Sequence, residues 1–585
     1  MTVENKIGGT VVCMKNIFFK IITLSLCMIM LMNVTAYNTC AAAENDAAAY
    51  SAITACGVWH RPNASGRETT LEGLCSVLDE MATAGINMVF LETFYHGMTV
   101  YKTNLVPYYT GFDKFDYGEY PDYLTAFATE AQKRGIEVHA WVESFYLGIS
   151  EDATLVKYFP EWLLKNEQGS IRHKTEGASL GGYIFLDPAN ADACAYLVKL
   201  YDEMLKKVPA LCGLNLDYIR YPVSDFYAGT DTGYTTAAMT EFAELYALSL
   251  NENTTPATFK QQIKANSLVG KWTDYRAGKV TEFVRQVAET VNENHRDRII
   301  SIAVHPDIAN AYNQKKQDFI TWVESGYIDV VTPMVYYYTA SQISSALKEM
   351  LPKFENVYCY AGLYTTYHDQ STGELEAHIR ASEKAGADGY VLFESVKTFF
   401  NPAHSYAEFL SQNLATDPVH TALPHWSSER LIAATSDILA QKLTQNGESE
   451  AAVNALVQEL ARIQQIGEST PEKLEETIAA ITALGNGTFP ELSLASKADV
   501  TASLTSLVSY LEVRQERLSA KGYPEEPIPP TENEGEDAPT DKDPTEERPD
   551  SPTPENNDKP KTLIDMICSF FKRIIDWFKS LFAKK

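Results

Sequence analysis

The chain has 585 residues and a formal net charge of −28, and 45% of its residues are hydrophobic. This length is too great for one ordinary domain, and the apolar content suffices for a large core, so we expect one large domain with appendages. The acidic balance argues against nucleic acid as a partner, because binding to phosphates needs clustered Lys and Arg.

Residues 1–43 have the pattern of a secretory signal peptide. Lys15 and Lys20 precede an apolar run, "IITLSLCMIMLMNV", and the small residues of "CAAAEN" follow it. Since this is the order of an n-region, an h-region and a cleavage site, we expect cleavage near Ala43 and a secreted, extracellular protein associated with the cell envelope. An uncleaved membrane anchor is the alternative.

The nine cysteines form no CxxC pair and have no regular spacing. Three of them, Cys13, Cys27 and Cys40, belong to the predicted signal peptide. Neither a disulfide framework nor a cysteine zinc site is therefore expected.

From Cys56 to Ser395 the sequence repeats a short apolar strand, a loop and a helical pattern. The predicted strands are "CGVWHRP", "NMVFLETF", "EVHAWVES", "GLNLDYIRYP", "ISIAVHP", "DVVTPMVYYY", "VYCYAGLY" and "GYVLFES". Helices end on glycine just before the next strand in "MATAGIN", "AQKRGIE" and "EKAGADG". Eight such units predict an α/β fold, a (β/α)8 TIM barrel over residues 55–415 with long strand-end insertions at 144–212 and 223–298. A doubly wound sheet is the alternative.

Three segments follow the predicted barrel. Residues 427–520 are helical and polar, which indicates a spacing or docking role. Residues 523–560 are rich in Pro and contain 13 Asp and Glu against 3 Lys and Arg, which predicts a disordered, self-repelling linker. Residues 561–585 place Phe, Leu and Ile at helical spacing on one face and Lys, Arg and Asp on the other. An amphipathic helix at a membrane surface is expected there, and a helix that docks on a partner is the alternative.

The carboxyl ends of the strands in a TIM barrel meet on one face, and several predicted strands end in acids. The candidate catalytic residues are Asp217, Glu143, Glu92 and Glu394. The candidate substrate-binding residues are Trp59, His60, Arg61, His139, Trp141, Tyr218, Arg220, His305 and Tyr336. Acids, aromatic rings and a few cations at one rim are typical of carbohydrate chemistry, in which two carboxyl groups flank a glycosidic bond and aromatic faces stack on sugars.

Roles can be predicted for two of the acids. Arg220 is expected to lower the pKa of Asp217, which favours a nucleophile or base. Glu143 lies near Trp141 on a drier strand end, so its pKa should be raised, as a general acid requires. Any single acid of this kind is more often a helix cap or an ion-pair partner than a catalyst.

A metal-dependent site is the less favoured hypothesis. His60, His139 and His305 could join Asp217 around a metal ion, but no HxH pair occurs at a strand end. We therefore expect neither a metal nor a cofactor. A GxSxG elbow is also missing, which argues against serine hydrolysis.

The motifs "GVWHRP", "HAWVES", "PEWLLKNEQG", "FLDPANAD", "LDYIRYP" and "VVTPMVYYY" resemble the glycosyl hydrolase-like 10 family over about residues 55–410. The resemblance implies a secreted or envelope glycosidase on a (β/α)8 barrel, acting on cell-wall glycan, with Asp217 as a catalytic carboxylate. One departure stands out, because amylase-like enzymes carry an acid after the fifth strand, where this chain has His305 and Pro306.

These patterns together predict a secreted glycoside hydrolase for a polysaccharide of the peptidoglycan type. The alternative is a barrel that binds glycans without cleaving them.

Overall fold

The computed structural model describes residues 54–522, apart from residue 355 and residues 366–370, 401–405 and 414–422. The predicted signal peptide (1–43), acidic linker (523–560) and C-terminal amphipathic helix (561–585) lie outside the described residues. Among the described helices, none is both long and apolar enough to cross a bilayer.

Eight parallel strands close into a barrel, as predicted, because the first strand pairs with both the second and the last. The parallel strands are β1 (Ala55–His60), β2 (Met88–Tyr95), β4 (Glu137–Glu143), β5 (Leu211–Asp217), β6 (Ile299–Val304), β7 (Val330–Pro333), β8 (Tyr358–Tyr364) and β9 (Gly389–Phe393). The short strand β3 (Met98–Thr99) pairs antiparallel with β2 and was not predicted. This closure excludes the doubly wound sheet.

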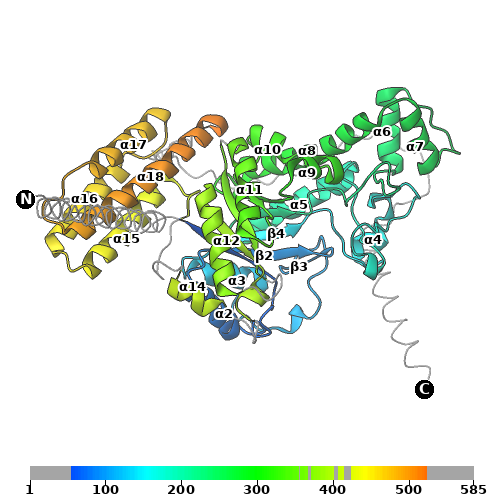
Figure 1. Cartoon of the computed structure of the whole chain (residues 1–585). Coiled ribbons are helices and arrows are strands. Elements are labelled where there is room, and N and C mark those ends of the chain that lie inside the picture. The colour runs from blue at the N-terminus through cyan, green and yellow to red at the C-terminus, as the bar shows by residue number, and fades with distance from the viewer. Residues whose placement is uncertain (1–53, 355, 366–370, 401–405, 414–422, 523–585) are drawn as a thin grey trace, which may run out of the picture. The chain divides into compact units, whose positions relative to one another are not determined.

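Helices cover the outside of the barrel (Figure 1). Those of the barrel region are α2 (Leu71–Thr83), α3 (Tyr123–Gln132), α5 (Ala191–Lys207), α9 (Ile308–Lys315), α10 (Phe319–Glu324), α11 (Ala340–Met350), α12 (Thr372–Ala385), α13 (Ser395–Thr398) and α14 (Ala407–Asn413), whereas α4 (Thr154–Tyr158) belongs to the insertion after β4. Three glycines that were expected to end helices, Gly85, Gly135 and Gly386, have positive φ angles, which only glycine adopts without strain.

Side chains alternate between the two faces of each strand, so each strand contributes to two cores. Outward residues such as Val58, Val89 and Ala140 pack against the helices. Inward residues form a separate cluster that fills the barrel with large rings, among them Trp59, Phe90, Trp141, Tyr358 and Tyr360. The barrel interior is therefore a packed core below the carboxyl ends of the strands.

The predicted insertion after β5 is a helical excursion with a core of its own. It contains α6 (Thr236–Tyr246), α7 (Pro256–Ala265) and α8 (Val269–Asn294). Trp272, Phe242 and Phe259 pack together within it. Beside them, Arg276 Nη1 lies 2.7 Å from Asp231 Oδ1, and both side chains are only 1% exposed. This buried ion pair ties helix α8 to the loop that follows β5.

The predicted helical region consists of α15 (Ser428–Gln445), α16 (Glu450–Gln464), α17 (Pro471–Gly485) and α18 (Leu494–Lys521). Leucine, isoleucine and valine side chains from these helices share one core. An ion pair between Arg517 of α18 and Asp329, which precedes β7, joins this region to the barrel. The helical region therefore contacts the barrel, and its spacing or docking role stays a prediction.

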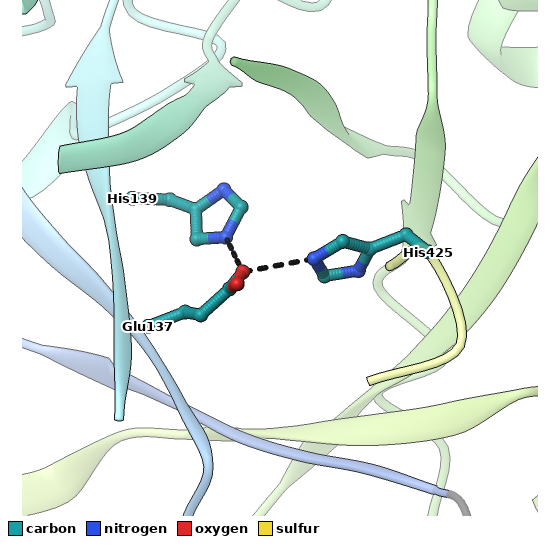
Figure 2. Close-up of side chains that lie close together, drawn as sticks. All are labelled: Glu137, His139 and His425. Atoms are coloured by element: carbon teal, nitrogen blue, oxygen red, sulfur yellow. Dashed lines mark hydrogen bonds and ion pairs between the residues drawn. The ribbon is translucent and has the colours of Figure 1, made fainter. Parts of the chain in front are cut away.

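The amino-terminal mouth of the barrel is closed around Glu137, the first residue of β4 (Figure 2). His425, just before α15, lies 2.9 Å from the Glu137 carboxylate, and His139 of β4 lies 3.4 Å from it. Trp426 Nε1 and Arg430 Nη2 approach the other oxygen at 2.5 and 3.1 Å. One buried carboxylate thus joins the helical region to the barrel.

Burial alone would raise the pKa of Glu137, but His425 and His139 outweigh it and hold that pKa well below its usual range. A group whose pKa is lowered on folding stabilises the fold above its unfolded-state pKa, and this contribution is lost as the pH falls. The link between the barrel and the helical region is therefore acid-sensitive.

We expect Glu137→Ala to lower the free energy of unfolding by about 3 kcal/mol at pH 7, because it leaves several buried donors without an acceptor. Chemical denaturation measures this, with the exposed Glu475→Ala as the matched control. The expected loss should shrink as the pH falls below the ordinary glutamate pKa. A loss under about 1 kcal/mol would contradict this role for Glu137.

Candidate active site

Four carboxyl groups gather at the carboxyl ends of neighbouring strands. Glu92 is in β2, Glu143 ends β4, Asp217 ends β5, and Glu394 directly follows β9. Glu143 and Asp217 are register partners on adjacent strands, and Glu92 is the register partner of Trp141. The structure therefore brings together all four predicted catalytic residues.

Arg61, which directly follows β1, is the cation of this group. Its Nε lies 2.9 Å from Glu394 Oε2, and its Nη1 makes a hydrogen bond to Glu92 Oε1. The guanidinium also lies over the rings of Trp141 and Tyr95, at 5.0 and 5.6 Å from their centroids. One positive charge thus holds two carboxylates from opposite sides.

The positive charge of Arg61 alone does not offset the effects of burial and of the neighbouring acids on the pKa values of this site. Burial and the charge of Glu394 raise the pKa of Glu92, whereas the charge of Arg61 lowers it. The resulting pKa of Glu92 is about 7. Glu92 is thus poised between its two protonation states at neutral pH.

Glu143 is the most strongly perturbed acid of the site. Burial raises its pKa well above the usual range, and the nearby charges of Glu92 and Asp217 raise it further. Its Oε2 atom is buried and accepts no hydrogen bond from any residue that the structure describes. The predicted rise in the pKa of Glu143 is confirmed, and this rise favours its protonated form.

Asp217 has a different environment. Trp141 Nε1 donates to its Oδ2 at 3.1 Å, and the backbone N–H of Tyr218 donates to its Oδ1 at 2.6 Å. Tyr218 has a φ of 47°, a left-handed conformation that costs a non-glycine residue on the order of 1 kcal/mol. Two donors aimed at one carboxylate favour its charged form.

The charge of Arg220 lowers the pKa of Asp217, as predicted, but the net shift of that pKa is upward. Burial dominates and raises that pKa, and the charge of Arg220 only partly offsets it. Arg220 instead makes a bidentate ion pair with Glu176, at 2.8 and 3.0 Å, and lies over the ring of Tyr218. Glu176 belongs to the insertion after β4, so this pair fastens that loop beside Asp217.

The structure does not support substrate contacts for Trp59, His60 and His139, which are each at most 1% exposed. Trp59 lies in the barrel interior and donates to Asn215. His60 points away from the interior, 2.9 Å from Glu68 and 2.7 Å from Ser395. His139 faces Glu137 at the opposite mouth (Figure 2).

The other predicted binding residues divide into two kinds. Trp141 is buried and orients Asp217, so it is no stacking surface. Arg61, Tyr218, His305 and Tyr336 are partly exposed. Tyr336 packs its ring against Tyr364 and Phe393.

Three residues of this face were missed by the sequence analysis. Tyr95 lies under Arg61, Glu176 pairs with Arg220, and Lys315 ends helix α9. Tyr95 could have been found, since it follows Glu92 by three residues at the same strand end. Glu176 and Lys315 lie in segments whose sequence has no periodic signal.

Among the described residues, the donor atoms that could hold a metal ion are those of Glu137, His139 and His425, which lie within 4.8 Å of one another. They are at the amino-terminal mouth and not among the acids of the strand ends. Their hydrogen bonds already satisfy the carboxylate, and Arg430 adds a positive charge that opposes a cation there. The cluster accordingly fits its role in joining the helical region to the barrel.

The sequence profile of the glycosyl hydrolase-like 10 family matches residues 57–362, more than half of the chain. The chain belongs to the glycosyl hydrolase-like 10 family. This confirms the resemblance found in the motifs, although the matched region ends earlier than the predicted one.

Curated relatives include "Glycosyl hydrolase DigH" of Escherichia coli K12 and of Shigella flexneri. Each is 20% identical over 286 residues, which are 46% of this chain and 58% of the relative. The chain thus matches little more than half the length of these relatives.

Solved structures with a related fold include a β-galactosidase from the psychrophilic Marinomonas ef1, with 13% identity, a TM-score of 0.41, and coverage of 67% of this chain and 60% of that one. An α-galactosidase from Thermus thermophilus has 11% identity, a TM-score of 0.34, and coverage of 63% and 62%. Similarity at this level carries no argument about activity.

We expect Arg61→Met to raise the pKa of Glu92 above about 7 by at least about one unit, since the charge of Arg61 is what lowers it. Carbon-13 NMR titration of labelled glutamate carboxyls, assigned with Glu92→Gln, measures the shift. Arg67→Met, which removes a surface ion pair with Glu80, is the control. An unchanged pKa of Glu92 would show that Arg61 does not control this carboxyl.

Proposed function

We propose that this glycosyl hydrolase-like protein is a glycosidase that cleaves O-glycosidic bonds of a bacterial polysaccharide, with Glu143 as general acid and Asp217 as nucleophile or base. The observation that carries the proposal is the pairing of these two acids in different environments. They are register partners at the ends of adjacent strands, yet Glu143 Oε2 has no hydrogen-bond partner among the described residues, whereas Asp217 receives two hydrogen bonds.

The chemistry follows from the two environments. A neutral Glu143 can donate its proton to the glycosidic oxygen as the bond to the anomeric carbon breaks. An ionised Asp217 can attack that carbon or remove a proton from an attacking water. Breaking the bond makes the sugar ring positively charged, and the acids of Glu92 and Glu394 lie close enough to favour that charge.

The substrate we propose is cell-wall glycan of the peptidoglycan type. The family and the curated relatives support a carbohydrate substrate in general, and the partly exposed ring of Tyr336 suits the face of a sugar ring. The choice of cell-wall glycan rests on the predicted export of the chain, because a secreted envelope protein is exposed to this polymer.

The proposal includes the predicted location. The signal pattern of residues 1–43 favours secretion, and the amphipathic pattern of residues 561–585 favours attachment to a membrane surface through the acidic linker. Both segments lie outside the described residues. Fractionation of cells that express the full chain and a chain ending at residue 560 tests this part.

Glu143→Gln should reduce kcat on natural glycan by about 10²–10⁴-fold, the usual contribution of a general acid. The loss should be much smaller on an aryl glycoside, whose leaving group needs no proton. The basic limb of the pH–rate profile should also move, because the protonated form of Glu143 is the active one. Release of reducing ends and of phenol measures the two reactions.

Asp217→Asn should abolish turnover of both substrates, since a neutral amide can neither attack nor activate water. Glu408→Gln, on the outer helix α14, is the control for a carboxyl lost elsewhere. Full activity of Asp217→Asn would overturn the assignment. Binding of glycan without any turnover by the wild type would favour the glycan-binding alternative.

A further inference from the structure

His60, Ser395 and Glu68 form a buried hydrogen-bonded series beside the carboxyl ends of β1 and β9. His60 Nδ1 lies 2.7 Å from Ser395 Oγ, and His60 Nε2 lies 2.9 Å from Glu68 Oε2. The ring of His60 also stacks on Phe127 of helix α3, with 5.2 Å between the ring centroids. The buried series therefore lies on the side of the strands that faces the helices.

A serine, a histidine and an acid in contact resemble a hydrolytic triad, in which the serine attacks the substrate. His60, Ser395 and Glu68 are each 0% exposed, however, so no substrate reaches the hydroxyl of Ser395. Any effect of the buried series on the active site is therefore transmitted through the residues next to it in the chain.

Glu68 is the anchor of the buried series. Its Oε2 accepts from the hydroxyl of Tyr123 at 2.5 Å and from the N–H of Asn63 at 3.0 Å, and its Oε1 accepts from the hydroxyl of Ser65 at 2.7 Å. Burial raises the pKa of Glu68, but the charge of His60 and the hydrogen bonds to the carboxylate outweigh burial and give a pKa of about 2. Because an ionised carboxylate only accepts, His60 carries a proton on Nε2.

The main-chain pairing of β1 with β9 stops short of the active site. Its last register pair is Val58 with Leu392, and both Arg61 and Glu394 lie beyond that pair. The separation of Arg61 and Glu394 is therefore set by side chains, because the ladder of main-chain hydrogen bonds between these two strands does not extend to them.

The buried series reaches both of these chain segments. His60 directly precedes Arg61, and Ser395 directly follows Glu394. In the active site, Arg61 Nε donates to Glu394 Oε2 at 2.9 Å, and Arg61 also makes a hydrogen bond to Glu92. Two contacts thus join the same two segments, a buried one between His60 and Ser395 and a partly exposed one between Arg61 and Glu394.

We propose that Glu68, His60 and Ser395 are positioning residues that hold Arg61 against Glu394 in the active site. Glu68 fixes the ring of His60, and this ring fixes Ser395 and with it the chain at the end of β9. The inference rests on the proposed function only for its effect on catalysis, since the contact between Arg61 and Glu394 can be measured without a substrate.

The test is the rate at which the Nε–H proton of Arg61 exchanges with water. Nitrogen-15 NMR of the full-length protein measures this rate, and the signal that is lost in Arg61→Met belongs to Arg61. We expect Ser395→Ala to raise the rate about tenfold, because the contact of Arg61 with Glu394 opens more often once the buried hydrogen bond between the same segments is lost. Ser395→Thr keeps the hydroxyl and should retain the slow exchange.

His60→Gln tests the same hydrogen bond from its other end. The glutamine amide can still donate to Glu68 but does not replace Nδ1, so this variant should raise the exchange rate as much as Ser395→Ala does. The double variant should exchange no faster than either single variant, because both changes remove one shared hydrogen bond. On a glycan that the wild type cleaves, each variant should lower kcat about tenfold with little change in KM, since positioning acts on the transition state more than on binding.

Ser382→Ala is the control, because Ser382 of helix α12 is equally buried and its hydroxyl donates to the carbonyl oxygen of Ile379 in the same helix. Its exchange rate should equal that of the wild type. An unchanged rate in both Ser395→Ala and His60→Gln, an equal increase in Ser382→Ala, or additive effects in the double variant would refute the positioning role. Wild-type protein that cleaves no glycan would refute the proposed function and leave the exchange result intact. If Ser395→Ala does not fold, the rate in His60→Gln decides.

Discussion

Electrostatic repulsion among the carboxyl groups at one end of the barrel is the main constraint on the candidate active site. Glu92 and Glu143 are buried beside the partly exposed Asp217, and Arg61 is the one cation in contact with an acid of this group among the described residues. Three negative charges cannot all persist in such a place, so at least one acid keeps its proton. Hydrogen bonds distinguish the acids, because two donors reach Asp217 and no described residue donates to Glu143 Oε2.

The rest of the fold makes this arrangement rigid. Large rings fill the barrel below the acids, and one of them, Trp141, both carries the hydrogen bond to Asp217 and lies against Arg61. The opposite mouth is closed by the helical region through Glu137. The acids at the two ends of strand β4 therefore have opposite pKa shifts. The pKa of Glu137 is lowered because donors surround its carboxylate, and the pKa of Glu143 is raised because other acids lie near it.

The barrel fold and the gathering of acids at its strand ends could be predicted from the sequence. Strand patterns and helix-ending glycines are local sequence signals, and the strand ends of a barrel must converge. Alternation along β1 would also have corrected one error, since His60 and Arg61 must point to opposite faces. His139 shares a face with Glu143, but four residues of strand place it about 13 Å deeper. The partner of Arg220 could not be predicted, because Glu176 reaches it from a loop whose path depends on tertiary packing.

The protonation state of Glu143 is the most direct test of the roles assigned to Glu143 and Asp217. Infrared difference spectroscopy of the wild type and Glu143→Gln, with carbon-13-labelled glutamate, reports a protonated carboxyl that belongs to this residue. We expect such a band at pH 7 in the wild type and its loss in the variant, with no matching band assigned by Asp217→Asn. An ionised Glu143 at pH 7, or a protonated Asp217 in its place, would contradict the division of roles between the two acids.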